Sequence, residues 1–438
     1  FVFESVEKGF IKGRYTIFGR NPDKIWEFNN NNCKLFYKNK SIKLKGNPKK
    51  NIEKIIEDFN FDIPKGLPSI SSILSGYFSY DIIRYIEKIP NNTKNDLNIP
   101  DSRILRPRNN IIHDNVEKKL YFIVNIFKDE NIIDFNRKFS LINKQIEELV
   151  FLANYNYPNS PLNINKLSKI KSNISKNRFI NNVKKAKKYI KIGDIFQVVL
   201  SQRFECKLTK KPIEIYKKLR KTNPSPFMYF FNFNDFQIIG ASPEILVRLR
   251  DNKITIRPIA GTRPRGKNKK QDLFFEKDLL NDKKELSEHL MLLDLGRNDT
   301  GKVSKINSVK VTESFKIERY SHVMHIVSNV EGSFNNKFTK FDTLLSGFPA
   351  GTVSGAPKIR AMEIIDELEN TRRKVYAGGI GYFSANGDFD TCIALRTAIS
   401  KNNKFFVQSG AGIVADSKPI NEFNETVNKA KALIKALE

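Results

Sequence analysis

The sequence predicts an α+β protein, a layered α/β sandwich in which helices pack on large antiparallel sheets. Short apolar segments rich in β-branched and aromatic residues follow one another closely at 227–259, and a second group lies at 378–415. Close succession favours pairing with the neighbouring segment, which is antiparallel. Strands and helices therefore come in runs, and this pattern fits α+β better than a doubly wound parallel sheet.

The first part of the chain mixes strands with a helix. We expect a hairpin at 34–46, a buried strand at 119–127 and a helix at 135–153. Residues 154–176 are rich in Asn, Ser and Pro without apolar periodicity, which is typical of a linker. The sequence thus predicts an N-terminal region at 1–153, a linker at 154–176 and a second domain at 177–438.

The second part begins and ends with a helix. Its predicted elements are a helix at 177–192, a strand at 195–206, a further helix, short strands at 227–233, 236–242 and 253–259, a long helix at 276–296, strands at 378–385, 389–400 and 404–415, and a closing helix at 420–437. Asp416 or Ser417 can cap the closing helix, and Pro419 suits its first turn.

Composition favours a protein of the cytoplasm. The 438 residues, 40% of them hydrophobic, can bury a substantial core. The sequence has no apolar run of about eighteen residues and no secretory signal pattern at its start, so we expect no membrane association. Three isolated cysteines favour a reducing compartment over a disulfide scaffold. Because the chain begins at Phe1 rather than at methionine, we expect residues upstream.

A net charge of +29 raises the question of nucleic-acid binding. The excess is mostly lysine, as in KKAKKYIK at 184–191, and it comes with abundant Asn, Ile and Phe, a mixture expected from AT-rich codons. No RNA-binding aromatic motif, zinc finger or basic zipper accompanies it. A solvated lysine surface explains the charge better than specific nucleic-acid binding.

Two Glu-x-x-Glu motifs carry the strongest chemical signal. Glu285 and Glu288 lie in an amphipathic segment, and Glu422 and Glu425 lie in the predicted closing helix. Spacing by three puts each pair on one helical face. Most such charged stripes are solvated surfaces. If the two pairs converge, however, four carboxylates form an all-oxygen site that requires a cation, and Mg²⁺ suits it.

Glycines and histidines supply further candidates. Gly410 and Gly412 precede the closing helix and leave backbone amides accessible for a carboxylate. The glycine-rich stretch at 346–368 lacks the phosphate-loop pattern, which argues against nucleotide binding. It is a loop that leads into a helix with free amides just before it, which favours anion binding. The order of Glu288 and His289 does not match a zinc protease motif. Of the four histidines, His113 and His289 are structural candidates, whereas His322 and His325 are three apart and could share a helix face or line a strand, and histidine is the natural proton carrier near neutral pH.

Seven spaced motifs resemble the chorismate-utilising enzymes. They lie within residues 177–438 and read, in order, RPIAGTRPRG, KELSEHLMLLDLGRND, SHVMHIVS, GFPAGTVSGAPK, YAGGIGYF, ALRTA and GAGIVADSKPINEFNETVNKA. Seven motifs in one order do not coincide by chance. Within the family, the resemblance is closest to the branch that aminates chorismate to anthranilate in tryptophan biosynthesis, a lyase reaction that eliminates pyruvate.

The resemblance implies a role for each matching residue. Mg²⁺ held by the four glutamates would bind the ring carboxylate of chorismate. Glu244 would be the general acid for loss of the C4 hydroxyl, and His325 the proton-transfer residue of pyruvate elimination. The positions implied in substrate binding are Thr262, Thr352, Tyr376, Arg396, Gly410, Gly412 and Lys429. An arginine fork and a helix-borne lysine suit carboxylates, whereas simple aromatic packing is nearly as good an explanation of Tyr376.

Two positions separate the branches of this family. Relatives that add water carry a lysine where this chain has Gln197, and a glutamine suits ammonia as the nucleophile. The aminodeoxychorismate synthases of folate biosynthesis carry a lysine where this chain has Ala260. Both positions favour anthranilate, with aminodeoxychorismate as the alternative product. A catalytically idle basic binding protein is a third hypothesis, opposed by retention of the implied catalytic residues.

A partner and a regulator also follow from the resemblance. No cysteine lies in a nucleophile elbow, so ammonia would come from a separate glutamine amidotransferase subunit in a hetero-oligomer. The N-terminal part resembles the family's regulatory half more loosely, since Phe1, Val2 and Phe3 stand where leucines are usual and Phe227 replaces a common tyrosine. Feedback tryptophan is expected at Glu4, Ser5, Pro224, Ser225, Pro226, Phe227 and Met228. Alternatively, these residues only join the first strand to the sheet.

Overall fold

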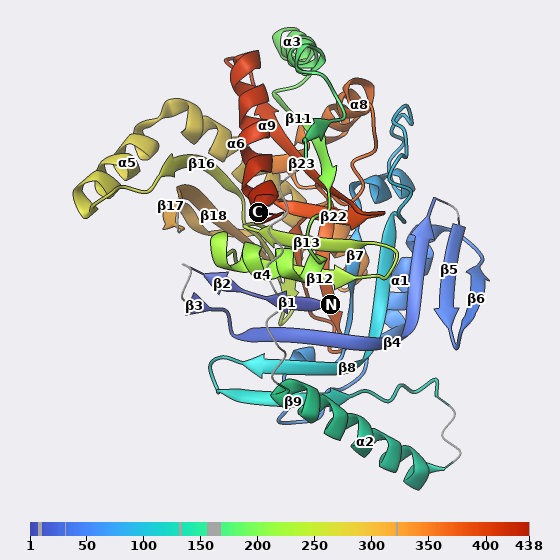
Figure 1. The fold of residues 1–438 in the computed structure, drawn as a ribbon. Helices are drawn as coiled ribbons and strands as arrows, with labels where there is room; N and C mark the ends of the chain where they lie inside the picture. Colours follow the sequence, from blue (N-terminus) through green and yellow to red (C-terminus); the bar gives the residue numbers. More distant parts are fainter. Residues whose placement is uncertain (8–10, 31, 131–133, 156–167, 321–322, 438) are drawn as a thin grey trace.

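The computed structural model describes residues 1–438 except 8–10, 31, 131–133, 156–167, 321–322 and 438. Within the described residues, 21 strands form one hydrogen-bonded sheet, and β2 and β3 form a small second sheet. The strand pairs are antiparallel, and helices cover the curved sheet (Figure 1). This arrangement confirms the predicted α+β class and the large antiparallel sheet.

The strands have the following bounds: β1 (Val2–Glu4), β2 (Val6–Glu7), β3 (Ile11–Lys12), β4 (Tyr15–Asn29), β5 (Asn32–Tyr37), β6 (Lys40–Leu44), β7 (Ile73–Phe78), β8 (Ser102–Asp114), β9 (Lys119–Val124), β10 (Lys171–Ser172), β11 (Gln197–Lys207), β12 (Phe227–Asn232), β13 (Gln237–Ser242), β14 (Ile245–Arg250), β15 (Lys253–Ile256), β16 (Ile259–Pro264), β17 (Lys310–Arg319), β18 (Val323–Ser333), β19 (Gly355–Ala356), β20 (Gly379–Ser384), β21 (Phe389–Ile393), β22 (Thr397–Lys401) and β23 (Lys404–Ile413).

The helices are α1 (Pro48–Asp58), α2 (Phe135–Asn154), α3 (Lys176–Lys191), α4 (Pro212–Thr222), α5 (Lys269–Asn281), α6 (Lys283–Gly301), α7 (Lys340–Ser346), α8 (Lys358–Leu368) and α9 (Pro419–Ile434). Short 3₁₀ turns are η1 (Ser69–Ser71), η2 (Tyr80–Tyr85), η3 (Gly351–Val353) and η4 (Lys435–Leu437). In the described part of the chain, no helix is long and apolar enough to cross a membrane.

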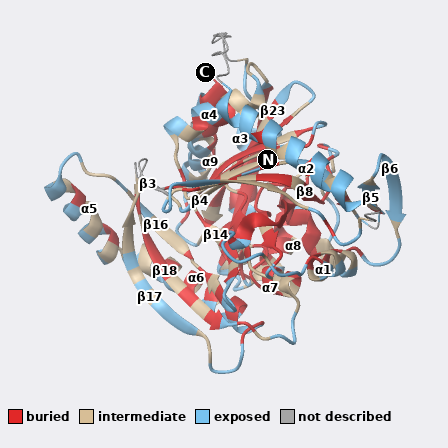
Figure 2. Cartoon of the chain, turned by 90° about the horizontal axis from the view of Figure 1, so that it is seen from below, coloured by how far each residue is buried: buried red, intermediate tan, exposed pale blue. Residues whose placement is uncertain are grey.

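The N-terminal and C-terminal parts of the chain share one sheet and one core. Strand β7 pairs with β20, and β1 lies between β4 and β12. The largest hydrophobic cluster combines early residues such as Trp26 and Phe28 with late ones such as Val247 and Ile364. Figure 2 shows buried residues concentrated around β14 and α8, with β6 and α2 largely exposed. Most of the predicted linker, at 156–167, lies outside the described residues.

Several predicted elements are confirmed. The hairpin at 34–46 is β5 and β6, the helix at 135–153 is α2, and the helix at 177–192 is α3. Strands β12 and β13 pair as antiparallel sequence neighbours. The glycine-rich stretch leads into α8, whose N-cap is Pro357, as expected of a loop that feeds a helix.

Other predictions were wrong in instructive ways. The strand predicted as buried at 119–127 is β9, whose side chains are exposed or half-buried, because in the described part of the chain it pairs with β8 alone. The helix predicted at 276–296 is two helices, since the Asp282 carboxylate accepts the amides of Lys284 and Glu285 and starts α6 anew. Strand β14 was missed.

The C-terminal strands and helix also differ from the prediction. The strand expected at 389–400 is divided into β21 and β22, and Arg396 between them has a φ of 46°. The closing helix begins at Pro419, as expected, but its N-cap is Lys418 and no side chain caps it, so neither Asp416 nor Ser417 has that role. Ser417 instead donates to the Gly412 carbonyl at 3.5 Å and accepts the Val414 amide.

Candidate functional site

Glu244 is a buried carboxyl with a hydroxyl as its side-chain partner, and no cation of the described residues forms an ion pair with it. It lies in the short connection between β13 and β14 with 6% of its surface exposed. The Thr352 hydroxyl donates to its Oε1 at 3.1 Å. Removal from water raises the pKa of Glu244 to about 8, and the Thr352 bond and an Ile259 backbone bond only partly oppose this shift. Glu244 is therefore protonated at neutral pH and can act as an acid.

The imidazole of His325 has the opposite protonation state. His325 lies in β18 opposite Thr262 of β16, and its Nδ1 is 3.0 Å from both the Gly261 carbonyl and the Thr262 hydroxyl. A carbonyl can only accept, so the proton lies on Nδ1 and the Nε2 lone pair is left available. Burial lowers the pKa of His325, and the cations of Arg396 and Lys429 add to this shift. His325 can therefore receive a proton.

The first glutamate pair faces the strand that carries Gln197. Glu285 and Glu288 lie on α6, and the Gln197 amide donates to Glu288 Oε1 at 2.9 Å. Burial followed by repulsion from Glu288 raises the pKa of Glu285. The carbonyl oxygen of Gln197 is buried and has no partner among the described residues. An open acceptor therefore lies beside a cluster of negative charge.

The second glutamate pair lies on α9. Burial raises the pKa of Glu422, and repulsion from Glu425 acts in the same direction. Lys284 of α6 lies close enough to Glu422 to oppose that shift, which places the starts of α6 and α9 near each other. The Lys429 ammonium is 2.6 Å from Glu425 and donates to the Gly410 carbonyl at 3.2 Å.

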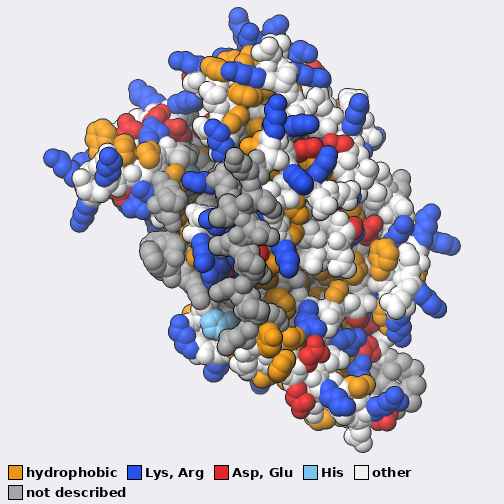
Figure 3. All heavy atoms as spheres, in the orientation of Figure 1, with side chains coloured by type: hydrophobic (Ala, Val, Ile, Leu, Met, Phe, Trp, Pro, Cys, Tyr) orange, Lys and Arg blue, Asp and Glu red, His pale blue; other side chains and the backbone are white. Residues whose placement is uncertain are grey.

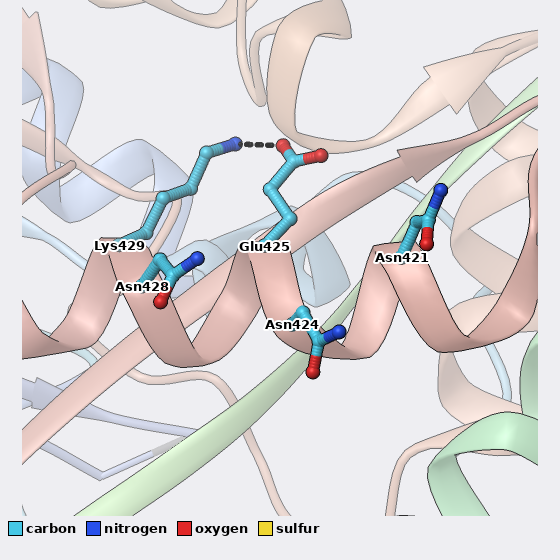
Figure 4. A pocket seen from close by; sticks show the side chains of 5 residues that line it. All are labelled: Asn421, Asn424, Glu425, Asn428 and Lys429. Atoms are coloured by element: carbon cyan, nitrogen blue, oxygen red, sulfur yellow. Dashed lines mark ion pairs between the residues drawn. The ribbon is translucent and has the colours of Figure 1, made fainter.

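A hollow of about 490 Å³ runs along the same face of α9. Its lining residues are Asn421, Asn424, Glu425, Asn428 and Lys429. Figure 4 shows the Glu425 carboxylate and the Lys429 ammonium meeting above the helix. Lys429 therefore neutralises part of the acidic pair and at the same time contacts the glycine strand β23.

The donor set of the four glutamates fits a hard divalent cation. All donors are carboxylate oxygens, which Mg²⁺ prefers, and two of the four carboxyls have pKa values raised by burial and mutual repulsion. A bound cation would relieve this repulsion. Among the described residues, no three Asp, Glu, His or Cys side chains are already drawn together around one point. The convergence of the two pairs on one ion thus stays a prediction.

The glycines of β23 make room for other polar groups. A Cβ at Gly410 would lie 2.5 Å from the Tyr376 hydroxyl, and one at Gly412 would lie 2.7 Å from the Gln197 amide nitrogen. Both contacts are too short for a side chain. The two glycines therefore allow Tyr376 and Gln197 to approach the strand closely.

Arg396 lies within electrostatic reach of His325. It occupies the break between β21 and β22, and Ala241 of β13 donates to its carbonyl oxygen at 3.1 Å. Burial of its guanidinium lowers its pKa, and none of the described residues forms a hydrogen bond or ion pair with that group. A half-buried cation without an anion is suited to a ligand carboxylate.

The residues predicted to bind tryptophan also come together. Strand β1 pairs with β12 so that Glu4 lies opposite Met228, and the Val6 amide donates to the Ser225 carbonyl at 3.0 Å. The residues of this cluster are Glu4, Ser5, Pro224, Ser225, Pro226, Phe227 and Met228. The proximity of the two segments is confirmed, whereas tryptophan binding stays a prediction.

Sequence reasoning missed the two residues that hold Glu4. The Tyr216 hydroxyl donates to Glu4 at 2.6 Å, and the Arg220 guanidinium donates at 2.8 and 2.7 Å. Tyr216 and Arg220 lie four residues apart on α4, on one helical face. That spacing was visible in the sequence, but nothing in the sequence said that this face would meet the first strand.

The chain resembles known proteins over its full length. A family model described as chorismate binding enzyme matches residues 7–435. Anthranilate synthase component 1 of Cereibacter sphaeroides is 46% identical over 100% of this chain and 89% of that protein. Anthranilate synthase component 1 of Acetivibrio thermocellus is also 46% identical, over 100% of this chain and 90% of that protein. The crystal structure of anthranilate synthase component I from Streptococcus pneumoniae TIGR4 superposes with a TM-score of 0.87 at 37% identity, covering 97% of this chain and 93% of that one.

Proposed function

The chain belongs to the chorismate-binding enzymes, close to the anthranilate synthase component 1 proteins, and on that premise we propose that it is the large subunit that converts chorismate and ammonia to anthranilate and pyruvate. The observation that carries this proposal is that a protonated Glu244 and an unprotonated His325 both lie near Tyr320, which is within electrostatic reach of Glu244 and has its ring centre 5.5 Å from that of His325. One group can give a proton and the other can take one.

The reaction needs both kinds of group in turn. Ammonia adds at C2 of the chorismate ring while the C4 hydroxyl departs, and Glu244 protonates that hydroxyl so that it leaves as water. His325 then takes the C2 proton through Nε2 as the C3 ether bond breaks, and the ring becomes aromatic with release of pyruvate. The sum is chorismate plus ammonia giving anthranilate, pyruvate and water.

The remaining residues bind and orient the substrate in this proposal. Arg396 and Lys429 supply cations for its carboxylates, and Thr352, Thr262, Tyr376, Gly410 and Gly412 complete the pocket. Glu285, Glu288, Glu422 and Glu425 would hold Mg²⁺, which supplies Lewis-acid polarisation of the ring carboxylate when bound. The Arg396 guanidinium has no anionic partner among the described residues, whereas Lys429 is already paired with Glu425 and would share its charge with the substrate.

Gln197 favours ammonia over water as the nucleophile. Its amide is neutral at every accessible pH and so cannot deprotonate water, whereas ammonia is a nucleophile without activation. Ala260, in β16 opposite Ile326, supplies no charge there. The aminodeoxychorismate alternative is not favoured, since the relatives described above are anthranilate synthases.

A second subunit would provide the ammonia in the cytoplasm. Cys33, Cys206 and Cys392 are free and buried, and burial raises the pKa of each thiol, so none suits nucleophilic release of ammonia from glutamine. A glutamine amidotransferase in a hetero-oligomer and feedback by tryptophan complete the proposal. Figure 3 shows lysine and arginine side chains scattered over the visible face, which agrees with a solvated basic surface.

The test is an assay of the purified chain with chorismate, Mg²⁺ and ammonium at mildly alkaline pH, with anthranilate followed by fluorescence and mass. We expect product from the wild type and none after EDTA or in Glu425→Gln. The matched control is Asn428→Ala, also on α9, which removes an uncharged side chain. A product of another mass would show that the chain does not make anthranilate. Activity that survives EDTA would show that the reaction does not depend on Mg²⁺.

Magnesium binding has a readout independent of turnover. Mg²⁺ should raise the melting temperature of the wild type, because a ligand that binds only the folded state stabilises it. The rise should be smaller in Glu425→Gln than in Asn428→Ala. Equal rises in both variants would show that the ion binds elsewhere.

A further inference from the structure

A buried guanidinium forms hydrogen bonds with two elements of the candidate site. Arg373 follows α8 and is 2% exposed, one of the largest fully buried side chains of the described protein. It forms an ion pair with Glu369, with Nε donating at 2.9 Å and a terminal nitrogen at 2.6 Å. Neither residue belongs to the motifs that resemble the family, and in the described structure neither forms a hydrogen bond or ion pair with Glu244 or His325.

The remaining donors of Arg373 bind two main-chain carbonyls. One terminal nitrogen donates to the Val353 carbonyl at 2.7 Å, and the other donates to the Val199 carbonyl at 2.6 Å. Val353 belongs to η3 and follows Thr352, the donor to Glu244. Val199 belongs to β11, two residues after Gln197, and lies opposite Gly412 of β23. The planar guanidinium of Arg373 thus fixes the distance between η3, which carries Thr352, and β11, which carries Gln197.

Glu369 extends this link to the second glycine. Its Oε1 accepts both the amide and the hydroxyl of Ser201 at 2.8 Å, and Ser201 pairs with Gly410. The Arg373 guanidinium also lies 5.5 Å from the centre of the Tyr376 ring, within reach of a cation–π contact. The elements that carry Thr352, Gln197, Tyr376 and the glycine strand therefore meet at one ion pair.

We propose that Arg373, with Glu369, is a positioning residue that sets the geometry between Glu244 and the β11–β23 wall of the site. The inference rests on the proposed function, since positioning has a measurable meaning only for a reaction. Arginine is required because its rigid fork reaches a carboxylate and two carbonyls at once, which a lysine ammonium on a flexible stem does not reproduce.

The neighbouring residue provides a matched control. Lys374 is 0% exposed and forms an equally buried ion pair, with its ammonium 2.7 Å from Asp101. Its amide donates to Asp81. Both partners belong to the N-terminal part of the chain, and among the described residues no hydrogen bond or ion pair of the Lys374 side chain reaches an element of the site. Arg373 and Lys374 thus share burial and charge but differ in what they hold.

The experiment compares Arg373→Lys with Lys374→Met in the full chain with chorismate, Mg²⁺ and ammonium. Folding is checked by circular dichroism and melting temperature. We expect kcat of Arg373→Lys to fall on the order of 100-fold, with KM changed by less than about threefold, because displacement of a reacting group by about 1 Å has this effect on the chemical step. Lys374→Met should lose stability but keep its kcat per folded molecule within about twofold.

The pH profile separates positioning from general weakening. When η3 shifts, Thr352 no longer donates well to Glu244, so the alkaline limb of kcat/KM should move to higher pH in Arg373→Lys and stay in place in Lys374→Met. If Arg373→Lys does not fold, Glu369→Gln, which keeps the size of the side chain, should show the same shift with a smaller loss of kcat.

The outcomes are distinct. In one outcome, kcat falls in proportion to melting temperature in both Arg373→Lys and Lys374→Met, and the alkaline limb does not move. This outcome would overturn the positioning role and leave the proposed function intact. A wild type that makes no anthranilate would overturn the proposed function first. Loss of kcat and a shifted limb in Arg373→Lys or Glu369→Gln alone would support the inference.

Discussion

Two buried glutamates in different regions of this protein show how a partner decides the use of a carboxyl group. Glu4 in the N-terminal strand and Glu244 behind β13 are 9% and 6% exposed. Glu4 is held by the Arg220 guanidinium and the Tyr216 hydroxyl, whereas Glu244 has a threonine hydroxyl and, within the described part of the chain, no cationic partner. Equal burial thus gives an ion pair in one region and a protonated acid in the other.

The difference teaches that burial alone does not mark a functional site. A buried carboxylate with a guanidinium partner joins two elements, here β1 and α4. A buried carboxyl without a cation keeps a proton that it can give away. The paired glutamates of α6 and α9 form a third case, in which burial, and after it repulsion from the neighbouring carboxylate, raises the pKa of Glu285 and Glu422 and favours a cation from outside.

The largest expected effect comes from removing the proton of the acid. Glu244→Gln keeps the shape and the contact with Thr352 but has no acidic proton, so we expect kcat for anthranilate formation to fall by about 10² to 10⁴-fold. Glu4→Gln should retain ammonia-dependent kcat within about threefold. Steady-state assays of both variants measure the two kcat values. Equal losses of kcat would contradict the different roles given to Glu4 and Glu244.

The second effect is a dependence of stability on pH that the raised pKa of Glu244 produces. Its pKa is about 8 in the folded state against about 4.3 in an unfolded chain, so between these values the folded state holds a proton that the unfolded state has lost. The contribution of Glu244 to the free energy of unfolding is therefore fully present below about pH 4. It declines by about 1.4 kcal/mol per pH unit until about pH 8.

Urea unfolding at several pH values measures this dependence. As pH rises through this window, the unfolding free energy of the wild type should fall relative to that of Glu244→Gln, because the glutamine does not titrate. A difference that stays constant from pH 5 to pH 8 would show that Glu244 is ionised throughout, and the comparison with Glu4 would fail.

A smaller effect follows from taking the cation away from Glu4. Arg220→Gln leaves the buried carboxylate with the Tyr216 hydroxyl, so we expect a loss of about 1–3 kcal/mol in unfolding free energy. Arg220 is partly exposed, which limits the loss. Differential scanning calorimetry should show a lower melting temperature with ammonia-dependent activity unchanged. Lys217→Gln, on the same helix and more exposed, is the control and should change little.

The smallest effect concerns the single hydroxyl at Glu244. Thr352→Val removes the donor that favours the ionised carboxylate, so the pKa of Glu244 should rise further and the alkaline limb of kcat/KM should move up by about half to one pH unit. The cost in stability should be about 1 kcal/mol. A pH–rate profile checks this prediction, and a limb that moves to lower pH would contradict the assigned role of the hydroxyl.

Periodicity predicted many of the elements but not their interruptions. The helix at 135–153 and the hairpin at 34–46 depend on local spacing, and both were predicted correctly. The divisions at Asp282 and Arg396 were missed, because a cap in the middle of an amphipathic run and a left-handed residue in the middle of an apolar run leave the average pattern unchanged.

The candidate site shows the same limit. The motifs named Glu244, His325, Arg396 and the four glutamates, and the structure places Arg396 and Lys429 within electrostatic reach of His325. The sequence did not indicate that Gln197 would donate to Glu288, or that Tyr216 and Arg220 would hold Glu4. These pairs join residues far apart in the chain, and no local spacing encodes them.

The sequence by itself determined the fold class, the family and the residue types available for proton transfer and anion binding, because hydrophobic periodicity and motif order are local properties of the chain. The tertiary structure decided that the Glu244 carboxyl is a protonated acid and that the Glu4 carboxylate forms an ion pair with Arg220. The pKa of a glutamate depends on the water, cations and hydrogen-bond donors around it, and for Glu244 this environment is assembled from η3, β13 and β16, which are separated in the sequence.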